Sequence, residues 1–271
     1  MNLDSGIPTA KAYDACIASP LFKSLERYSD TFLRRNRSHL LWYSIRWSED
    51  PLNHSTRRWE YPYARERLTR TNTRRVLDAG SGITFFPYYL MESNPGLTVT
   101  CCDRDDYVGQ VYAKINRNQA HKVEFKRCDL SSLPFPDGSF DSIYCISVLE
   151  HTGDREAIVR EFRRVLRPGG QLIVTFDISL DGSKDIPVSD AGALLASLSS
   201  NLQQLDRAAL DAGRNDNYVT DQGIDRARWL SPWKLYRWSL SAARSLLSGR
   251  LPRTSPMTIY CAEFVRPEHA E

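Results

Sequence analysis

The sequence lacks a long apolar run, and this absence argues against a membrane-spanning protein. Its 271 residues nowhere contain the roughly 18 consecutive apolar residues that a spanning helix needs. The first residues, Met1 to Asp4, include an acid and no apolar stretch, so we predict no signal peptide. With 41% hydrophobic and 25% charged residues, the composition is that of an ordinary globular protein, and we expect it in the cytoplasm.

The cysteines show no pattern that would indicate a disulfide framework or a metal site. There are six, with no CxxC pair and no regular spacing, and most lie in short apolar runs where buried thiols are common. We therefore expect reduced thiols and no bound metal.

The net charge of +3 is small, but it is unevenly distributed. Residues 21–75 contain 13 Lys and Arg against 6 Asp and Glu. This excess fits a solvated helical surface, or an electropositive wall that faces an anionic acceptor such as a phosphate, a nucleotide-sugar or nucleic acid.

The chain divides into a regular core with less regular segments on both sides. The core alternates short apolar runs with helical ones, which predicts a parallel sheet in an α/β fold. We expect strands at 75–79, 97–103, 123–129, 142–147 and 171–177, and helices at 85–93, 106–118 and 154–166. We divide the chain into a helical and aromatic cap (1–72), the core (73–180), a helical insertion (181–256) and a last strand returning to the sheet (257–271).

Polar residues stand where the predicted strands end, which is where open parallel sheets bind their ligands. Asp78 lies at the end of the first strand, before the turn Gly80-Ser81-Gly82, and Asp103 ends the second about twenty residues later. Asp129 and Ser147 end the third and fourth. Singly, these acids are equally typical of a braced turn, a helix cap or a solvated strand end.

The glycine turn differs from a dinucleotide site. A nicotinamide cofactor needs a small residue three places after the second glycine, and Phe85 stands there. A cofactor without a pyrophosphate, such as S-adenosylmethionine (SAM), fits this crowded helix start better. Its ribose suits an acid such as Asp103.

Four stretches in register carry a resemblance to a known family: VLDAGSG (76–82), CCDRD (101–105), CDLSSLPFPDGSFDSIYCISVLEH (128–151) and RVLRPGGQLIVT (164–175). The sequence resembles class I SAM-dependent methyltransferases of the ubiquinone/menaquinone-methylase-like (type 11) subgroup. The resemblance implies a Rossmann-like, doubly wound, mostly parallel sheet with a helical cap. Thr84, where many members have a third glycine, is a departure from the pattern.

The resemblance also implies a set of cofactor-binding residues. Asp78 would support the turn and the methionine ammonium, Asp103 would bind the ribose diol, and Asp129 would accept from the adenine amino group beside Leu130. The backbone of Ser147 would face the methionine end. The full expected set is Asp78, Gly80, Ser81, Gly82, Asp103, Arg104, Asp129, Leu130 and Ser147, with S-adenosylhomocysteine as the product.

His151 is the first candidate for a catalytic base, because it follows the fourth strand and an imidazole titrates near neutral pH. It could instead simply order the loop. His54 is a weaker rival, Glu150 is expected to be structural, and Asp177 and Asp181 would bind acceptor hydroxyls or cap the insertion.

The flanking segments suggest the acceptor. The aromatic stretch 47–68 offers ring faces for a sugar, with Arg57 or Arg58 for a phosphate, or it staples the cap onto the sheet. The basic, amphipathic segment 231–250 predicts a cap helix rather than a membrane-surface helix. We expect O-methylation of a sugar, nucleotide-sugar or natural-product intermediate. The alternatives are a nucleic-acid methylase, a quinone or lipid C-methylase, and a non-catalytic SAM-binding protein; the oligomeric state stays open.

Overall fold

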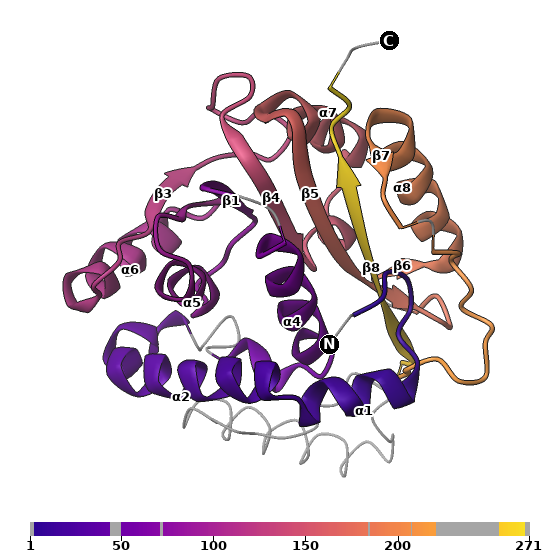
Figure 1. The fold of residues 1–271 in the computed structure, drawn as a ribbon, viewed down its shortest axis with the longest axis horizontal. Coiled ribbons are helices and arrows are strands. Elements are labelled where there is room, and N and C mark those ends of the chain that lie inside the picture. Colours follow the sequence, from indigo (N-terminus) through magenta and orange to yellow (C-terminus); the bar gives the residue numbers. More distant parts are fainter. Residues whose placement is uncertain are drawn as a thin grey trace, which may run out of the picture.

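A single mixed sheet forms the centre of the protein. The computed structural model describes residues 3–43, 50–70, 73–183, 185–206, 208–220 and 255–268. The strand order is β3-β2-β1-β4-β5-β8-β7, and β6 pairs with β5 (Figure 1). The strands are β1 (Arg75–Ala79), β2 (Thr98–Asp103), β3 (Glu124–Arg127), β4 (Phe140–Ile146), β5 (Leu166–Ser179), β6 (Ile186–Pro187), β7 (Gln203–Gln204) and β8 (Met257–Val265).

Helices cover both faces of this sheet. They are α1 (Ala10–Ala18), α2 (Pro20–Leu40), α4 (Arg57–Leu68), α5 (Phe86–Ser93), α6 (Asp106–Ile115), α7 (Arg155–Val165) and α8 (Val188–Asn201), with short 3₁₀ turns at Pro51–Asn53, Asn116–Asn118 and Leu149–His151. One buried cluster joins the sheet to α1, α2, α4, α5 and α6, and a second joins it to α7 and α8. The fold is therefore the expected Rossmann-like, doubly wound α/β architecture with helices on both faces.

The carboxyl end of the chain returns to the sheet, as expected. β8 runs antiparallel to β5 in register from Gln171↔Val265 to Ser179↔Met257. It is not the outermost strand, because β7 pairs with its other side. Residues 167–170 lie between the helix expected at 154–166 and the strand expected at 171–177, outside both predictions. They lie within β5, where pairing with β4 shifts register between Phe140 and Ser142.

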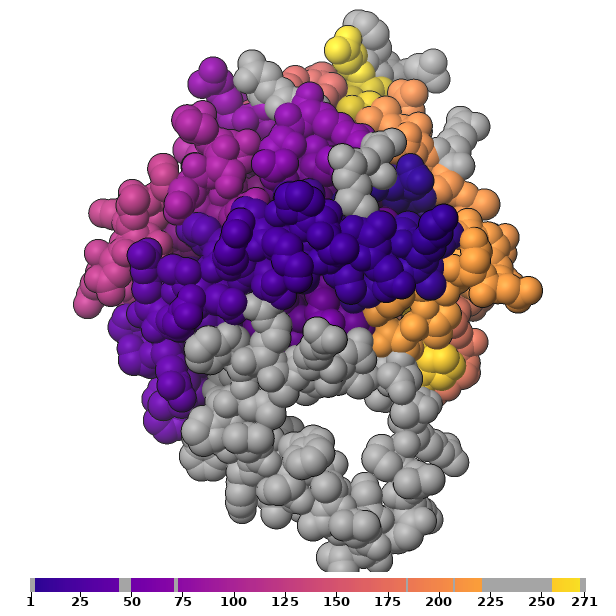
Figure 2. All heavy atoms as spheres, turned by 60° about the horizontal axis from the view of Figure 1, so that its bottom comes forward, coloured from indigo at the N-terminus to yellow at the C-terminus, as the bar shows by residue number. Residues whose placement is uncertain are grey.

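The amino-terminal helices form a further layer over α4, α5 and α6. α2 is capped by Ser19, whose hydroxyl accepts from the N–H of Phe22 at 3.1 Å, and Pro20 begins its first turn. Its apolar side chains are buried in the same cluster as those of α5. Figure 2 shows residues of α1 and α2 running across this side of the molecule. The amino-terminal segment is thus packed onto the core rather than trailing from it.

Two expectations fall on residues that lie outside the described part. They are the amphipathic helix expected at 231–250 and the start of the aromatic stretch at 47–49. None of the described helices is both long and apolar enough to cross a membrane. The division of the chain at 72, 180 and 256 stays a prediction.

Candidate functional site

The glycine turn after β1 has the close packing that its sequence predicts. The N–H groups of Gly80 and Ser81 both donate to the carbonyl oxygen of Cys102, at 3.0 and 2.9 Å. Gly80 has φ +75°, and a Cβ built on it would lie 2.6 Å from Cγ1 of Val148. Gly82 has φ +49°, and its Cβ would lie 2.7 Å from the hydroxyl of Tyr43. Both positions need glycine, for conformation and for space.

Asp103 at the end of β2 is tied to this turn. Its Oδ2 accepts from the N–H of Gly82 at 3.0 Å, and its Oδ1 accepts from the N–H of Asp105 at 3.0 Å. The carboxylate therefore lies directly beside the turn and is only partly exposed. These bonds leave lone pairs on both oxygens, as a ribose diol would require.

Asp78 lies beneath the turn, with 5% of its surface exposed. Its Oδ2 accepts from the thiol of Cys101 at 3.7 Å. Burial raises the pKa of Asp78 to about 7, although its hydrogen-bonding neighbours act in the opposite direction. A carboxyl group with such a pKa responds strongly to a cation placed beside it.

Asp129 and Arg104 lie on the open side of the same edge. Asp129 is exposed, and its Oδ1 accepts from the N–H and the hydroxyl of Ser131 at 2.9 and 2.8 Å. These bonds lower the pKa of Asp129. Leu130 is buried next to it, and Arg104 is exposed. An adenine ring at this place would contact solvent on one side.

Ser147, after β4, adopts an unusual backbone conformation. Its φ is +49°, in the left-handed region that a non-glycine residue rarely occupies. Its N–H donates to the carbonyl oxygen of Thr175 in β5 at 2.9 Å, and its hydroxyl donates to Oε1 of Glu60 at 2.6 Å. Strain of this kind is typical of functional turns.

A buried cluster of charged groups surrounds Ser147. Arg57 forms an ion pair with Oε2 of Glu60 at 2.6 Å and reaches Oδ2 of Asp177 at 3.5 Å, and it also contacts the Ser147 hydroxyl. Oε1 of Glu150 accepts from the N–H of Asp177 at 3.2 Å. Burial and the neighbouring acids raise the pKa of Asp177 to about 7 and raise that of Glu150 as well.

His151 lies on the solvent side of this cluster, with its side chain 59% exposed. Its Nδ1 is 3.7 Å from Oδ1 of Asp185. Burial of part of the ring, together with Arg57, lowers the pKa of His151, while Asp185 acts against the shift. The lowered pKa favours the neutral imidazole, and Nε2 is the ring nitrogen that does not face the Asp185 carboxylate.

Two other candidates, His54 and Asp181, make hydrogen bonds within local turns. His54 follows the 3₁₀ turn 51–53, and its N–H donates to the carbonyl of Pro51 at 3.1 Å. Asp181 accepts from the N–H of Ser183 and from the hydroxyls of Ser179 and Ser255, which closes the loop after β5.

The contacts of Arg57 do not support the expectation that it serves a phosphate. Arg57 is already paired with Glu60 and Asp177, because α4 places it over the carboxyl ends of β4 and β5. The Nε of Arg58 donates to the carbonyl of Leu52 at 2.9 Å. This bond to a neutral oxygen does not neutralise Arg58, so its role toward a phosphate stays a prediction.

Sequence reasoning missed the contributions of Tyr43, Glu60 and Thr175. Tyr43 is 7% exposed, and its hydroxyl accepts from the N–H of Ile83 at 3.1 Å, directly over the glycine turn. Glu60 lies in the stretch Trp59–Tyr63, where one acid among aromatic residues was the available signal. Thr175 ends the quoted stretch 164–175, but no motif links Tyr43 or Glu60 to the core, so only the folded chain brings these residues together.

The comparisons with known proteins agree with this geometry. Residues 77–174 match the family model described as "Methyltransferase domain". Methyltransferase GfsG of Streptomyces halstedii is 34% identical over 126 residues, which cover 44% of this chain and 43% of that protein. The tRNA U34 carboxymethyltransferase of Nautilia profundicola is 29% identical, over 41% of this chain and 36% of that protein. The chain thus matches less than half the length of these relatives.

A solved structure shows that the fold extends beyond the matched core. The [4+2]-cyclase SpnF superposes with a TM-score of 0.53 at 21% identity, covering 77% of this chain and 81% of that one. The likeness concerns the fold alone. The name of that protein also shows that this fold does not by itself determine the reaction.

Proposed function

The chain carries a class I SAM-dependent methyltransferase core of the type 11 group, and from this premise we propose that it methylates a hydroxyl oxygen of a small molecule. The observation that carries the proposal is the carboxyl edge of β1 and β2. There a glycine turn with two positive φ angles lies against the carboxylate of Asp103 and above the buried Asp78. This cradle and its two acids fit the ammonium and ribose of SAM.

The residues of the turn would hold SAM by its two polar ends. Asp103 would accept from the ribose hydroxyls, and Asp78 with the backbone of Gly80 and Gly82 would face the methionine end. Asp129 and Leu130 would border the adenine on the open side. SAM supplies an activated methyl group on a sulfonium, so the protein mainly has to align the acceptor oxygen.

His151 is the proposed base. Because Nδ1 lies near Asp185, Nε2 is the atom that would take the proton of the acceptor hydroxyl. Asp185 would then stabilise the imidazolium that forms. This arrangement supports transfer to oxygen, which needs a proton acceptor more than a reactive carbon does.

The charges around Ser147 support a neutral acceptor at this place. Glu60 and Asp177 pair with the guanidinium of Arg57, and Glu150 lies close to the same group. A phosphate next to the reacting oxygen would have to compete with these carboxyl groups for Arg57. A sugar or a polyol-like intermediate carries hydroxyls without such a charge and suits it better.

The test is transfer of labelled methyl from SAM into a fractionated host extract, preceded by calorimetric titration of SAM. Label in the aqueous small-molecule fraction, with formation of S-adenosylhomocysteine, supports the proposal. Label in nucleic acid, with acceptor binding that falls steeply with salt, would establish the nucleic-acid alternative. Label in lipid or quinone would establish the C-methylase alternative, and binding of SAM without any product would indicate a non-catalytic protein.

A further inference from the structure

Glu60 is a buried carboxylate that contacts its own helix, the turn after β4 and strand β5. It lies on α4 with 0% exposure. Its Oε1 accepts from the hydroxyls of Ser147 and Thr175, both at 2.6 Å, and its Oε2 accepts from Arg57 at 2.6 Å. A buried carboxylate costs several kcal/mol unless its oxygens are satisfied, and here both are.

These bonds connect an amino-terminal helix to the turn after β4. Ser147 is held by its hydroxyl to Glu60 and by its N–H to the carbonyl of Thr175, and the Thr175 hydroxyl binds Glu60 in turn. The closed set of contacts holds Ser147 in a left-handed conformation that a non-glycine residue rarely adopts. Without Glu60, the Ser147 hydroxyl would keep only Arg57 as a described partner.

We propose that Glu60 is a positioning residue for methyl transfer, which acts through Ser147 on the turn leading to His151. The inference rests on the proposed function, because it assumes that this turn borders the methionine end of SAM. The 3₁₀ turn Leu149–His151 begins two residues after Ser147. A rotation at Ser147 would therefore move both the cofactor-facing backbone and the proposed base.

A role in stability alone would not require a carboxylate at position 60. Replacing buried ionic groups with well-packed apolar side chains is often neutral or stabilising. Position 60 faces the core in a helix rich in aromatic residues, where an apolar side chain would serve packing equally well. The carboxylate instead orients two hydroxyls at once, that of Thr175 in β5 and that of Ser147 just after β4.

The experiment compares Glu60→Gln with Thr175→Val and with the control Glu66→Gln. Glutamine at position 60 has one acceptor oxygen and one amide donor, so it cannot satisfy the two hydroxyls and the Arg57 guanidinium together, and the set of contacts around Ser147 must rearrange. Valine at position 175 removes one hydroxyl and keeps the shape. Glu66 lies on the same helix and also pairs with an arginine, Arg70, but it contacts the N–H of Leu3 rather than the strand ends. Each variant is assayed for thermal unfolding, SAM affinity, kcat and KM.

We expect Glu60→Gln and Thr175→Val to remain folded and to lower SAM affinity or kcat by up to about 100-fold, the size expected for a small misplacement of reacting groups. Glu66→Gln should keep wild-type kinetics. Wild-type affinity and kcat in both test variants, with only a lower unfolding temperature, would overturn the inference. If Glu60→Gln does not fold, Thr175→Val alone decides. Failure of the wild type to bind SAM would overturn the proposed function and this inference together.

Discussion

Single glycine residues determine how closely the turn after β1 can approach its neighbours. Gly80 has φ +75°, and a Cβ at this position would lie only 2.6 Å from Val148, whose side chain contributes three atoms within 3.2 Å. Because the whole Val148 side chain would have to shift, a substitution here moves the turn after β4 as well. The two loops of the site are therefore sterically coupled.

Gly80→Ala should destabilise the protein by about 1–3 kcal/mol and abolish tight SAM binding, because strain and a clash act together. Gly153→Ala is the matched control, since nothing lies within 4 Å of its Cβ position and its φ is not positive. Urea unfolding and SAM titration measure both effects. Equal behaviour of the two alanine variants would contradict the assigned role of Gly80.

His151 gives the second prediction for a single side chain. His151→Ala should keep SAM affinity and lower kcat by about 10²–10⁴-fold, the usual contribution of a general base. Because burial and Arg57 lower the pKa of His151, the wild-type rate should fall only as the pH drops below the ordinary histidine range. The acid limb of the kcat profile should disappear in the variant. An unchanged rate would leave His151 with a loop-ordering role.

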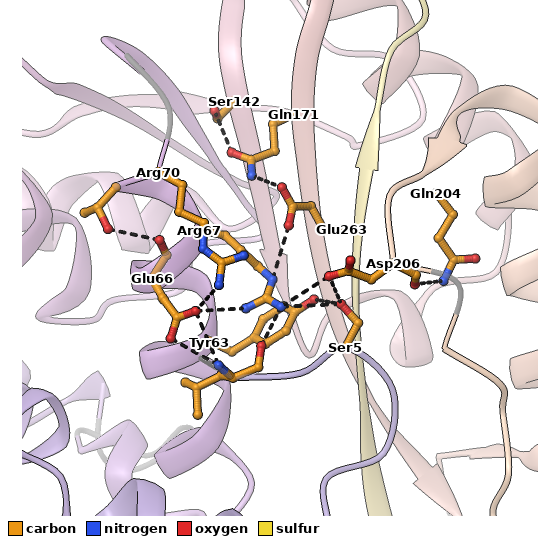
Figure 3. Close-up of polar contacts among 12 residues, drawn as sticks. Ser5, Tyr63, Glu66, Arg67, Arg70, Ser142, Gln171, Gln204, Asp206 and Glu263 are labelled. Atoms are coloured by element: carbon orange, nitrogen blue, oxygen red, sulfur yellow. Dashed lines mark hydrogen bonds and ion pairs between the residues drawn. The ribbon is translucent and has the colours of Figure 1, made fainter. Parts of the chain in front are cut away.

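Among the helices, α4 carries buried charge at both of its ends. Near its start Glu60 faces the strand ends, and near its end Arg67 faces β8 with 1% of its surface exposed. Arg67 forms an ion pair with Glu263 at 3.3 Å, donates to the carbonyl of Leu3 at 2.6 Å and stacks on the ring of Tyr63 (Figure 3). This second network joins the first residues of the chain to the last strand.

Arg67→Ala should lower the free energy of unfolding by about 3–5 kcal/mol, because it leaves Glu263 buried without its cation. Arg70→Ala is the control on the same helix. Its side chain is 42% exposed, and its ion pair with Glu66 should contribute about 1 kcal/mol or less. Urea denaturation of both variants separates the two cases. Similar midpoints would show that the Arg67 network is energetically minor.

The same elements show what the sequence could predict. The strands near 75–79, 98–103 and 140–146 were expected within two residues, because each is a short apolar run bounded by turn residues. Residues 167–170 fall between the predicted helix and the predicted fifth strand, and in the structure they lie in β5 as an irregular stretch between Leu166 and Gln171, which pair with Phe140 and Ser142 of β4. β7 was missed because two residues, Gln203–Gln204, carry no periodic pattern.

Across the whole molecule, local motifs located the candidate site residues at the strand ends but not the residues that pack against them from other elements. Asp78 and Asp103 lie at the ends of strands that a sequence pattern can locate, and Ser147 follows such a strand. Tyr43 lies 40 positions from its partner Ile83 in the sequence, and Glu60 lies 87 positions from its partner Ser147. Both nevertheless reach the same edge of the sheet. Contacts of this range depend on how α2 and α4 pack, which no local pattern specifies.

Buried carboxyl groups also make the stability of the whole molecule depend on pH. The pKa values of Asp78 and Asp177 are raised to about 7 in the folded state, above the value of about 4 for an unfolded aspartate. Between these values the folded state binds more protons than the unfolded state. The free energy of unfolding should therefore fall as the pH rises from about 4 to 7, by up to about 1.4 kcal/mol per pH unit and group.

Asp78→Asn and Asp177→Asn should each flatten this slope in urea denaturation across the same pH window. A slope identical to that of the wild type would show that the residue does not titrate there.

The binding of SAM should also be coupled to the ionisation of Asp78, because the methionine ammonium would favour the ionised form of this carboxyl group. SAM binding near pH 6.5 should then release protons, which titration calorimetry in buffers of different ionisation enthalpy measures. Proton release in Asp177→Asn but not in Asp78→Asn would assign the ammonium to Asp78, whereas release in both variants would place it elsewhere.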